Sequence, residues 1–201
     1  MAIHRDEVGR YLSRAAAAGR PAVAGRPAAE VEEDSAGSVV AAAVSAAAER
    51  GRAGDQMRTR EFLSKLEHDR ILEAIREAES KTSGEIRVLI QRGKVKSDPL
   101  VAAERKFQRL GMHKTRERNA VLIFVAPRVH KLAVVGDQGI HEKCGVQFWQ
   151  HVAAAMHDYF GQQKFTDGIG GAITAIGDVL AQHFPKTSRD TNELPDNVIE
   201  E

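Results

Sequence analysis

The sequence predicts an α/β domain, a three-layer α/β/α sandwich around a small mixed sheet. Two apolar runs, 86–90 and 121–126, flank a segment with helical spacing of its apolar residues. This order is typical of parallel strands joined by a right-handed crossover helix. A third apolar run, 132–135, follows after a short turn and is expected to pair antiparallel with the second. Helical patterns before and after these runs are expected to cover both faces of the sheet.

This globular pattern does not extend over the whole chain of 201 residues. Residues 1–56 are rich in Ala, Arg, Gly and Glu and hold almost no aromatic or large aliphatic residue. Such a composition predicts a disordered extension, and Met57 is a second candidate start of the protein. The domain is expected over residues 57–185, and residues 186–201 are expected to form a polar tail.

Composition narrows the function classes. The net charge of about +1 gives no global field that would recruit nucleic acid or an anionic membrane. Cys144 is the only cysteine, which excludes an intrachain disulfide and predicts a reducing, cytoplasmic compartment. No apolar stretch approaches the roughly 20 residues that span a bilayer, so no transmembrane segment is expected.

The first half of the domain follows from local patterns. Apolar residues at helical spacing over 62–78 predict an amphipathic helical region before the first strand. In that strand, Ile86, Val88 and Ile90 alternate with other residues, as in a half-buried strand. The crossover helix is expected to begin at Asp98-Pro99, a capping carboxylate followed by proline at the first helical position.

The second half of the domain supplies the centre of the sheet and two more helices. Residues 120–126 are apolar on both faces, which places this strand in the middle of the sheet. The third strand is expected beside it. Helices are then predicted from the apolar spacing of residues 146–160 and 165–184.

Polar residues stand at the same end of all three predicted strands. Glu85 precedes the first strand and Asn119 precedes the second, whereas Asp137 follows the third, which runs in the opposite direction. We therefore expect the three residues to converge, with about 10 Å spanning two strand spacings. Oxygen ligands of this kind suit Ca²⁺ or Mg²⁺, so Glu85, Asp137 and Asn119 are candidate metal ligands.

Each candidate also has a structural alternative. Glu85 is equally a solvated residue at the start of a strand, and Asp137 a turn former. Asn119 is a candidate for bonding the backbone across the loops. His141 is a candidate proton donor or the solvated start of a helix. Arg118 and Arg87 have the paired donors that hold a phosphoryl oxygen, or else they pair with Glu85.

The opposite end of the sheet is basic. This cluster is expected to bind an anion or an acidic partner, or to be a solvated end of the loops. It contains no interleaved aromatic residues, so stacking on nucleic-acid bases is not expected. Its members lie in the loop after the first strand and in the hairpin turn: Arg92, Lys94, Lys96, Arg128, His130 and Lys131.

Five short motifs follow one another along the chain in a characteristic order: 82–87 (TSGEIR), 118–126 (RNAVLIFVA), 136–140 (GDQGI), 165–169 (FTDGI) and 183–185 (HFP). In this order and spacing, residues 61–185 resemble the TPM-domain family. The resemblance implies an α/β/α sandwich, and some members are described as acid phosphatases or as calcium-binding, others as assembly or repair factors. Many members carry Asp-Asn-Gly where this chain has Arg118-Asn119-Ala120, and many are secreted with a membrane anchor.

Three function classes are open on these grounds. The first is a metal-dependent phosphatase with Ca²⁺ or Mg²⁺ near Glu85 and Asp137, in which Asp137, His141 and Arg118 are the candidate catalytic residues. The second is a non-catalytic module that binds a protein partner and assists a membrane-associated or repair complex. The third is a calcium-binding structural domain. No P-loop, dinucleotide fingerprint or nucleophile elbow is present in the sequence.

Overall fold

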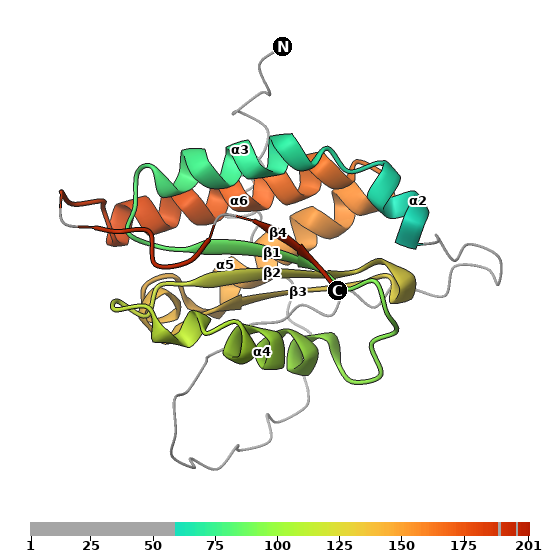
Figure 1. Cartoon of the computed structure of the whole chain (residues 1–201), viewed down its shortest axis with the longest axis horizontal. Helices are drawn as coiled ribbons and strands as arrows, with labels where there is room; N and C mark the ends of the chain where they lie inside the picture. The colour runs from blue at the N-terminus through green and yellow to red at the C-terminus, as the bar shows by residue number, and fades with distance from the viewer. Residues whose placement is uncertain (1–58, 189, 196) are drawn as a thin grey trace, which may run out of the picture. The chain divides into compact units, whose positions relative to one another are not determined.

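The computed structural model describes residues 59–188, 190–195 and 197–201, so the predicted extension over residues 1–56 lies outside the described residues. The described chain forms a four-stranded mixed sheet between two layers of helices, as the α/β prediction required (Figure 1). The strands lie in the order β3-β2-β1-β4. Their bounds are β1 Ile86–Ile90, β2 Val121–Ala126, β3 Lys131–Gly136 and β4 Val198–Glu200.

The strand directions confirm the predicted topology. β1 and β2 are parallel, with Ile86 opposite Val121, and β2 and β3 are antiparallel, with Val121 opposite Gly136. The start of β1, the start of β2 and the end of β3 therefore lie at one end of the sheet. β4 is parallel to β1 on its outer edge.

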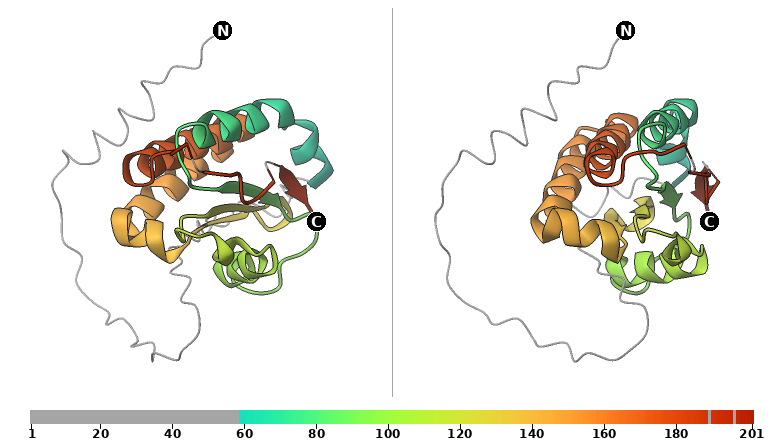
Figure 2. Two further views of the ribbon diagram at one scale, coloured as in Figure 1. Left: turned by 60° about the vertical axis from the view of Figure 1, so that its left-hand side comes forward. Right: turned by 90° about the vertical axis from the view of Figure 1, so that its left-hand side faces the viewer.

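The helices divide unequally between the two faces of the sheet. Figure 1 and Figure 2 show one face covered by α3, α5 and α6, and the other by α4 alone. Two 3₁₀ turns, η1 and η2, lie before β2 and between β2 and β3. The bounds are α2 Thr59–Ser64, α3 His68–Glu79, α4 Pro99–Arg109, η1 Met112–Lys114, η2 Pro127–Val129, α5 Gln138–Gly161 and α6 Phe165–His183.

Alternation along the strands builds a separate core on each face. In β2, Val121, Ile123 and Val125 pack with the core of α3, α5 and α6, whereas Leu122 and Phe124 pack with the core of α4. Every residue of β2 is at most 1% exposed. The strand is thus apolar throughout because it contacts helices on both faces.

The helix α5 differs from its prediction. Apolar spacing predicted a helix from residue 146, but α5 begins at Gln138, with Asp137 as its N-cap. Gly145 interrupts it with a φ of 68° and a ψ of 174°, so two helical pieces of different direction are joined there. Val146, expected on the buried stripe, is 49% exposed beside this kink.

The predicted polar tail, residues 186–201, contains a strand that its sequence did not indicate. The N–H of Glu201 donates to the carbonyl of Ile90 at 3.1 Å, which extends the β1–β4 pairing past the last strand residue. Val198 packs against the core of α3, α5 and α6, and Ile199 against that of α4. Two apolar residues are too few for a recognisable period, and the edge of β1 supplies what the local sequence lacks.

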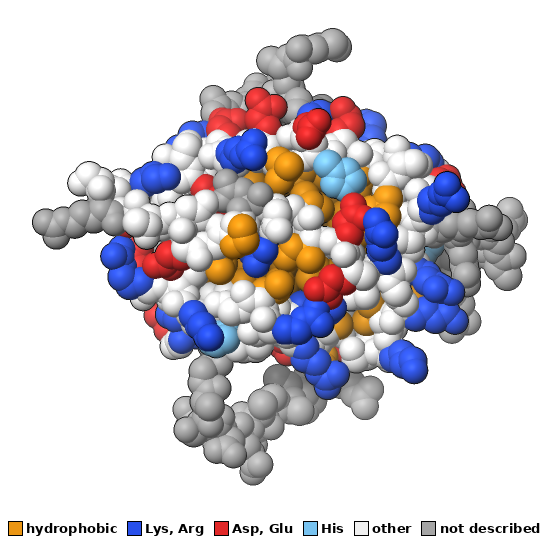
Figure 3. Space-filling model, viewed as in Figure 1, with side chains coloured by type: hydrophobic (Ala, Val, Ile, Leu, Met, Phe, Trp, Pro, Cys, Tyr) orange, Lys and Arg blue, Asp and Glu red, His pale blue; other side chains and the backbone are white. Residues whose placement is uncertain are grey.

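Ion pairs hold the end of this tail from both faces of the sheet. Glu200 pairs with Arg92 and, at 2.8 Å, with His68, whereas the next residue, Glu201, pairs with Lys106 and Arg109 of α4. The alternation of side chains along an extended strand sends the two acids to opposite faces. Figure 3, in the orientation of Figure 1, shows acidic and basic side chains interleaved around a hydrophobic band on this surface.

We predict that the tail detaches on acidification. Hydrogen bonds from Lys106 and Arg109 lower the pKa of Glu201 despite its partial burial. Burial raises the pKa of Glu200, but hydrogen bonds from Arg92 and His68 outweigh it and lower that pKa too. With both folded-state pKa values below the unfolded value of about 4.3, the stabilisation is present above that pH and is lost as the pH falls through the folded values.

The measurement is the protection factor of the Glu201 amide against hydrogen exchange at pH 6 and at pH 3, with a central amide of β2 as the control. A Glu201 amide as protected at pH 3 as at pH 6 would show that the two carboxylates do not hold the tail.

Two glycines of α6 provide a matched test of the helix packing. A Cβ on Gly177 would lie 2.6 Å from the Cβ of Ala78 in α3, whereas a Cβ on Gly170 would meet no atom within 4 Å. We expect Gly177→Ala to lower the free energy of unfolding by about 1–3 kcal/mol through overpacking. Gly170→Ala should raise it by about 0.5–1 kcal/mol because alanine is the better helix former. Denaturant unfolding of both variants measures this, and equal effects would contradict the close approach of α3 and α6.

Candidate functional site

The three polar residues predicted to converge lie at one end of the sheet. The N–H of Val121 donates to the carbonyl of Glu85 at 2.8 Å, and the N–H of Asp137 donates to the carbonyl of Ala120 at 2.9 Å. These two bonds continue the strand pairing by one residue. They place Glu85, the Asn119–Ala120 step and Asp137 side by side across β1, β2 and β3.

Asp137 is fully buried, and its carboxylate is bound by two elements of the fold. Oδ1 accepts the N–H of Gln138 at 2.8 Å, the N-cap bond of α5. Nε and Nη2 of Arg118 donate to Oδ2 and Oδ1, each at 2.8 Å, which is a bidentate pair. The hydrogen bond to Asp137 raises the pKa of Arg118. Asp137 thus caps the turn into α5 and is not an open ligand, because both oxygens have partners inside the protein, and Arg118 pairs with Asp137 rather than with the expected Glu85.

Arg118 is held in position by close packing between two backbone segments. Its φ is 52°, in the left-handed region that side chains other than glycine seldom adopt. Its carbonyl accepts the N–H of Ile140 at 3.3 Å in the first turn of α5. A Cβ on Gly139 would lie 2.8 Å from the same carbonyl oxygen, so only glycine fits this contact. The loop before β2 and the start of α5 therefore form one unit around the ion pair.

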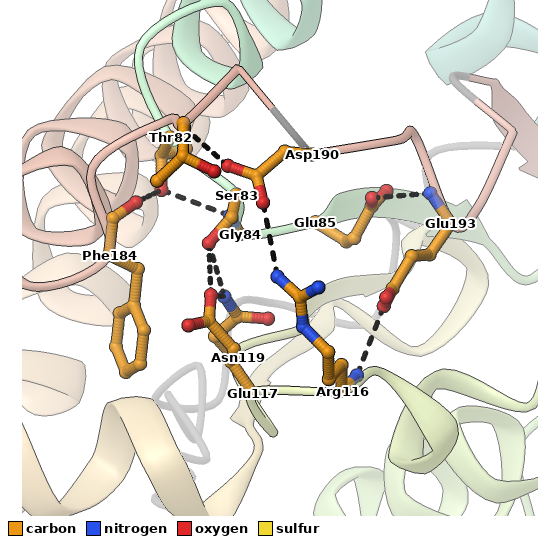
Figure 4. Close-up of polar contacts among 11 residues, drawn as sticks. Thr82, Ser83, Gly84, Glu85, Arg116, Glu117, Asn119, Phe184, Asp190 and Glu193 are labelled. Atoms are coloured by element: carbon orange, nitrogen blue, oxygen red, sulfur yellow. Dashed lines mark hydrogen bonds and ion pairs between the residues drawn. The ribbon is translucent and has the colours of Figure 1, made fainter.

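Glu85 is also buried, at 4% exposure, and is held by the tail. Its Oε1 accepts the backbone N–H of Glu193 at 2.8 Å (Figure 4). The solvated position considered for this residue is therefore wrong. The tail bond has no counterpart in the local sequence, because the two residues lie more than a hundred positions apart.

Asn119 organises two polar side chains that the sequence analysis did not single out as site residues. Its Nδ2 donates to Ser83 Oγ at 3.2 Å and lies 3.4 Å from Glu117 Oε2, and Ser83 Oγ also donates to Glu117 (Figure 4). Asn119 is 1% exposed. It bonds side chains in the described structure rather than the loop backbone that was expected as an alternative.

Arg116 attaches the tail to the other side of this cluster. Its Nη2 donates to Asp190 Oδ1 at 3.1 Å, and its backbone N–H donates to Glu193 Oε2 at 3.1 Å. In Figure 4 the guanidinium of Arg116 lies between the tail and the loop before β2. The carboxylates at this end of the sheet are thus interleaved with arginine side chains.

Two cavities adjoin the cluster. The larger, about 240 Å³, has mixed charges in its lining, including Arg76, Glu79, Glu85, Lys186 and Asp190. The smaller, about 20 Å³, lies among Ser83, Glu117, Asn119 and Glu193. A volume of that size is about that of a single water molecule or a bare cation.

His141 lies in the first turn of α5, where its Nδ1 accepts the indole N–H of Trp149 at 3.2 Å. This bond fixes the imidazole against the core and leaves Nε2 for any other contact. Cys144, three residues on, is a half-buried thiol whose burial raises its pKa to about 11. It is therefore protonated at neutral pH and unsuited to a nucleophile.

The residues predicted as metal ligands do not fit one ion in this arrangement. Glu85 and Asp137 lie on opposite sides of β2, about 10 Å apart by two strand spacings, and both oxygens of Asp137 are bound to Arg118. Within the part of the chain that the structure describes, no three His, Cys, Asp or Glu side chains are grouped to hold a metal ion. The fixed charge of Arg118 also repels a divalent cation at this position.

Comparison with known proteins assigns the fold to a family. The family profile of the TPM domain matches residues 57–179. The chain belongs to the TPM-domain family. A solved relative is the BA42 protein of the psychrophilic bacterium Bizionia argentinensis, an NMR structure with 34% sequence identity and a TM-score of 0.62. The alignment covers 67% of this chain and 92% of BA42, and no curated protein matches this chain significantly.

The matched region and the whole described chain add two further facts about this TPM domain. The family match ends at residue 179, so the tail that binds Glu85 and β1 lies beyond it. Among the described residues, none of the helices combines the length and the apolar character needed to cross a membrane.

We predict that Asp137 is structural. Asp137→Asn keeps the shape and the N-cap of α5 but removes the charge that holds Arg118. Because Arg118 is one-third exposed, water partly screens the pair, and we expect a loss of about 2 kcal/mol in the free energy of unfolding. The loss should be the same in EDTA and in millimolar Ca²⁺. Chemical denaturation measures it, with exposed Glu142→Gln as the control, and a loss that appears only with Ca²⁺ would mark Asp137 as a metal ligand.

Proposed function

We propose that this TPM-domain protein is a non-catalytic binding module for a protein partner. The bidentate ion pair between Arg118 and fully buried Asp137 carries this proposal. The residue best placed by sequence to be a metal ligand or an acid–base group is bound within the fold. Phosphate-ester hydrolysis with a metal needs open carboxylate oxygens that hold the ion and polarise water.

The same pair disfavours phosphate binding at Arg118. Its Nε and Nη2 form the fork that would hold two phosphoryl oxygens, and both donate to Asp137. His141, the candidate proton donor, is bonded to Trp149 through Nδ1. Each of the three candidate catalytic residues therefore has a structural partner that accounts for its position.

The tail supports the binding proposal, because two surfaces of this domain contact an extended segment of the same chain. The carboxylate of Glu85 receives a main-chain N–H, and the edge of β1 receives an extended strand. Main-chain contacts of this type do not depend on one particular ligand sequence, which suits a module that recognises a partner protein.

A second candidate function, divalent-cation binding with phosphatase-like activity, rests on one observation. Ser83 and Glu117 offer side-chain oxygens at the cavity of about 20 Å³, which Asn119 and the cationic Arg116 also line. Oxygen donors around a space of ion size are the ligands that Ca²⁺ and Mg²⁺ take. In this second function, Glu117 replaces Asp137 as the candidate cation ligand. Membership of the TPM-domain family is compatible with this function.

One experiment separates the two functions. The full chain is titrated with Ca²⁺ and with Mg²⁺ in a calorimeter, and hydrolysis of p-nitrophenyl phosphate is followed with each ion present. The binding module should show neither saturable heat in the millimolar range nor hydrolysis above buffer. Saturable binding that is lost in Glu117→Gln but kept in Glu142→Gln, together with metal-dependent hydrolysis, would replace the binding module by the phosphatase.

A further inference from the structure

The outer edge of β1 is bound by the tail through contacts that any extended segment could make. β4 pairs with Val88, Leu89 and Ile90 in parallel register, and its main chain supplies the hydrogen bonds. The tail lies beyond the family match, and β4 is only three residues long. The edge of β1 therefore lies within the matched TPM region, whereas its occupant lies outside that match.

Basic side chains stand on both faces of the sheet where β4 ends. His68 and Arg92 bind Glu200 on one face, and Lys106 and Arg109 bind Glu201 on the other. Arg92 belongs to the basic cluster that was expected to bind an anion or an acidic partner, or to be a solvated end of the loops. An extended segment with two consecutive acids would place one carboxylate on each face, because its side chains alternate.

The tail does not provide an acceptor for every hydrogen-bond donor at this edge, and Arg87 is the example. Its side chain is 6% exposed, and Nη2 donates to Asn197 Oδ1 at 2.6 Å. Its Nε is buried and has no hydrogen-bond acceptor among the described residues. Burial lowers the pKa of this guanidinium, with Glu85 and Glu79 opposing the shift. An asparagine offers one acceptor oxygen where the fork of an arginine can use two.

A carboxylate at the position of Asn197 would offer this guanidinium a second acceptor oxygen. Arg118 shows the arrangement in the same protein, since its Nε and Nη2 together hold the two oxygens of Asp137. A buried donor without an acceptor costs free energy that a better ligand recovers. The unpartnered Nε is thus a specific reason to expect a ligand other than the tail.

We propose that the outer edge of β1 is a docking groove for a partner protein's extended acidic segment of the pattern Asp-apolar-apolar-acid-acid, which residues 197–201 occupy in cis. The two apolar residues take the places of Val198 and Ile199, and the leading aspartate binds Arg87. This assignment rests on the proposed function and names the class of its partner. The tail, linked to the groove, competes with the partner at a high effective concentration.

The test compares acetylated, fluorescent pentapeptides on the full chain carrying Val198→Gly and Ile199→Gly, which weaken the resident strand. The peptide Asp-Val-Ile-Glu-Glu should bind about tenfold more tightly than Asn-Val-Ile-Glu-Glu, because a charged bidentate bond replaces a neutral one. Asp-Val-Ile-Gln-Gln should bind at least tenfold more weakly than the first. The unsubstituted chain should bind all three more weakly than the variant does. In Arg87→Lys, the preference for aspartate over asparagine should disappear.

Three results would overturn the proposal. They are absence of peptide binding, equal binding of the Glu-Glu and Gln-Gln peptides, and a concentration-dependent dimer of the unsubstituted chain through exchanged tails, which would make a second copy the occupant. Asn197→Asp in the otherwise unchanged chain provides a test that does not depend on the weakened strand. It should raise the unfolding midpoint and slow exchange of the Glu201 amide, and no change in either would refute the carboxylate preference.

The same samples keep this inference separate from the proposed function. Peptide failure without phosphate-ester hydrolysis overturns the groove and leaves the binding module in place. Metal-dependent hydrolysis overturns the binding module whatever the peptides do.

Discussion

The double burial of β2 is the constraint on which the rest of this structure depends. A strand with no exposed face needs a strand on each side and a helical layer on each surface. β1 and β3 provide the first, and α4 together with α3, α5 and α6 provides the second. The opposite directions of β1 and β3 relative to each other then bring Glu85 and Asp137 to the same end of the sheet. The polar cluster is thus a consequence of packing around one apolar strand.

The elements with a strong local period could be predicted from the sequence. The crossover helix was recognisable from Asp98-Pro99, and the structure shows the Asp98 side chain accepting the N–H of Leu100 at 2.8 Å. The strand β4 could not be predicted in this way. Its two apolar residues are held in an extended conformation by pairing with β1. Basic side chains of α3, α4 and the loop after β1, which are remote in the sequence, bind the acidic residues at its end. Long-range pairing of this kind leaves no local signal.

The candidate site divides along the same line. Convergence of Glu85, Asn119 and Asp137 followed from strand direction alone, so the topology was sufficient to predict it. The binding partner of each side chain depends on its orientation and on interatomic distances, which the topology does not determine. The sequence has Arg118 at a position where many family members have an aspartate. It did not show that the guanidinium of Arg118 binds Asp137. A left-handed backbone at Arg118 and a glycine contact at residue 139 decide that geometry.

The three-residue strand β4 also affects the behaviour of this protein in concentrated solution. β1 reads Ile-Arg-Val-Leu-Ile, a segment of high β-propensity with one charge. Left as an edge, it would be a template on which other chains add strands and aggregate. β4 caps that template with a short strand that ends in two carboxylates, and a short acidic edge is a poor template for further growth. Removal of the tail would therefore leave the edge of this apolar strand open to pairing with other chains.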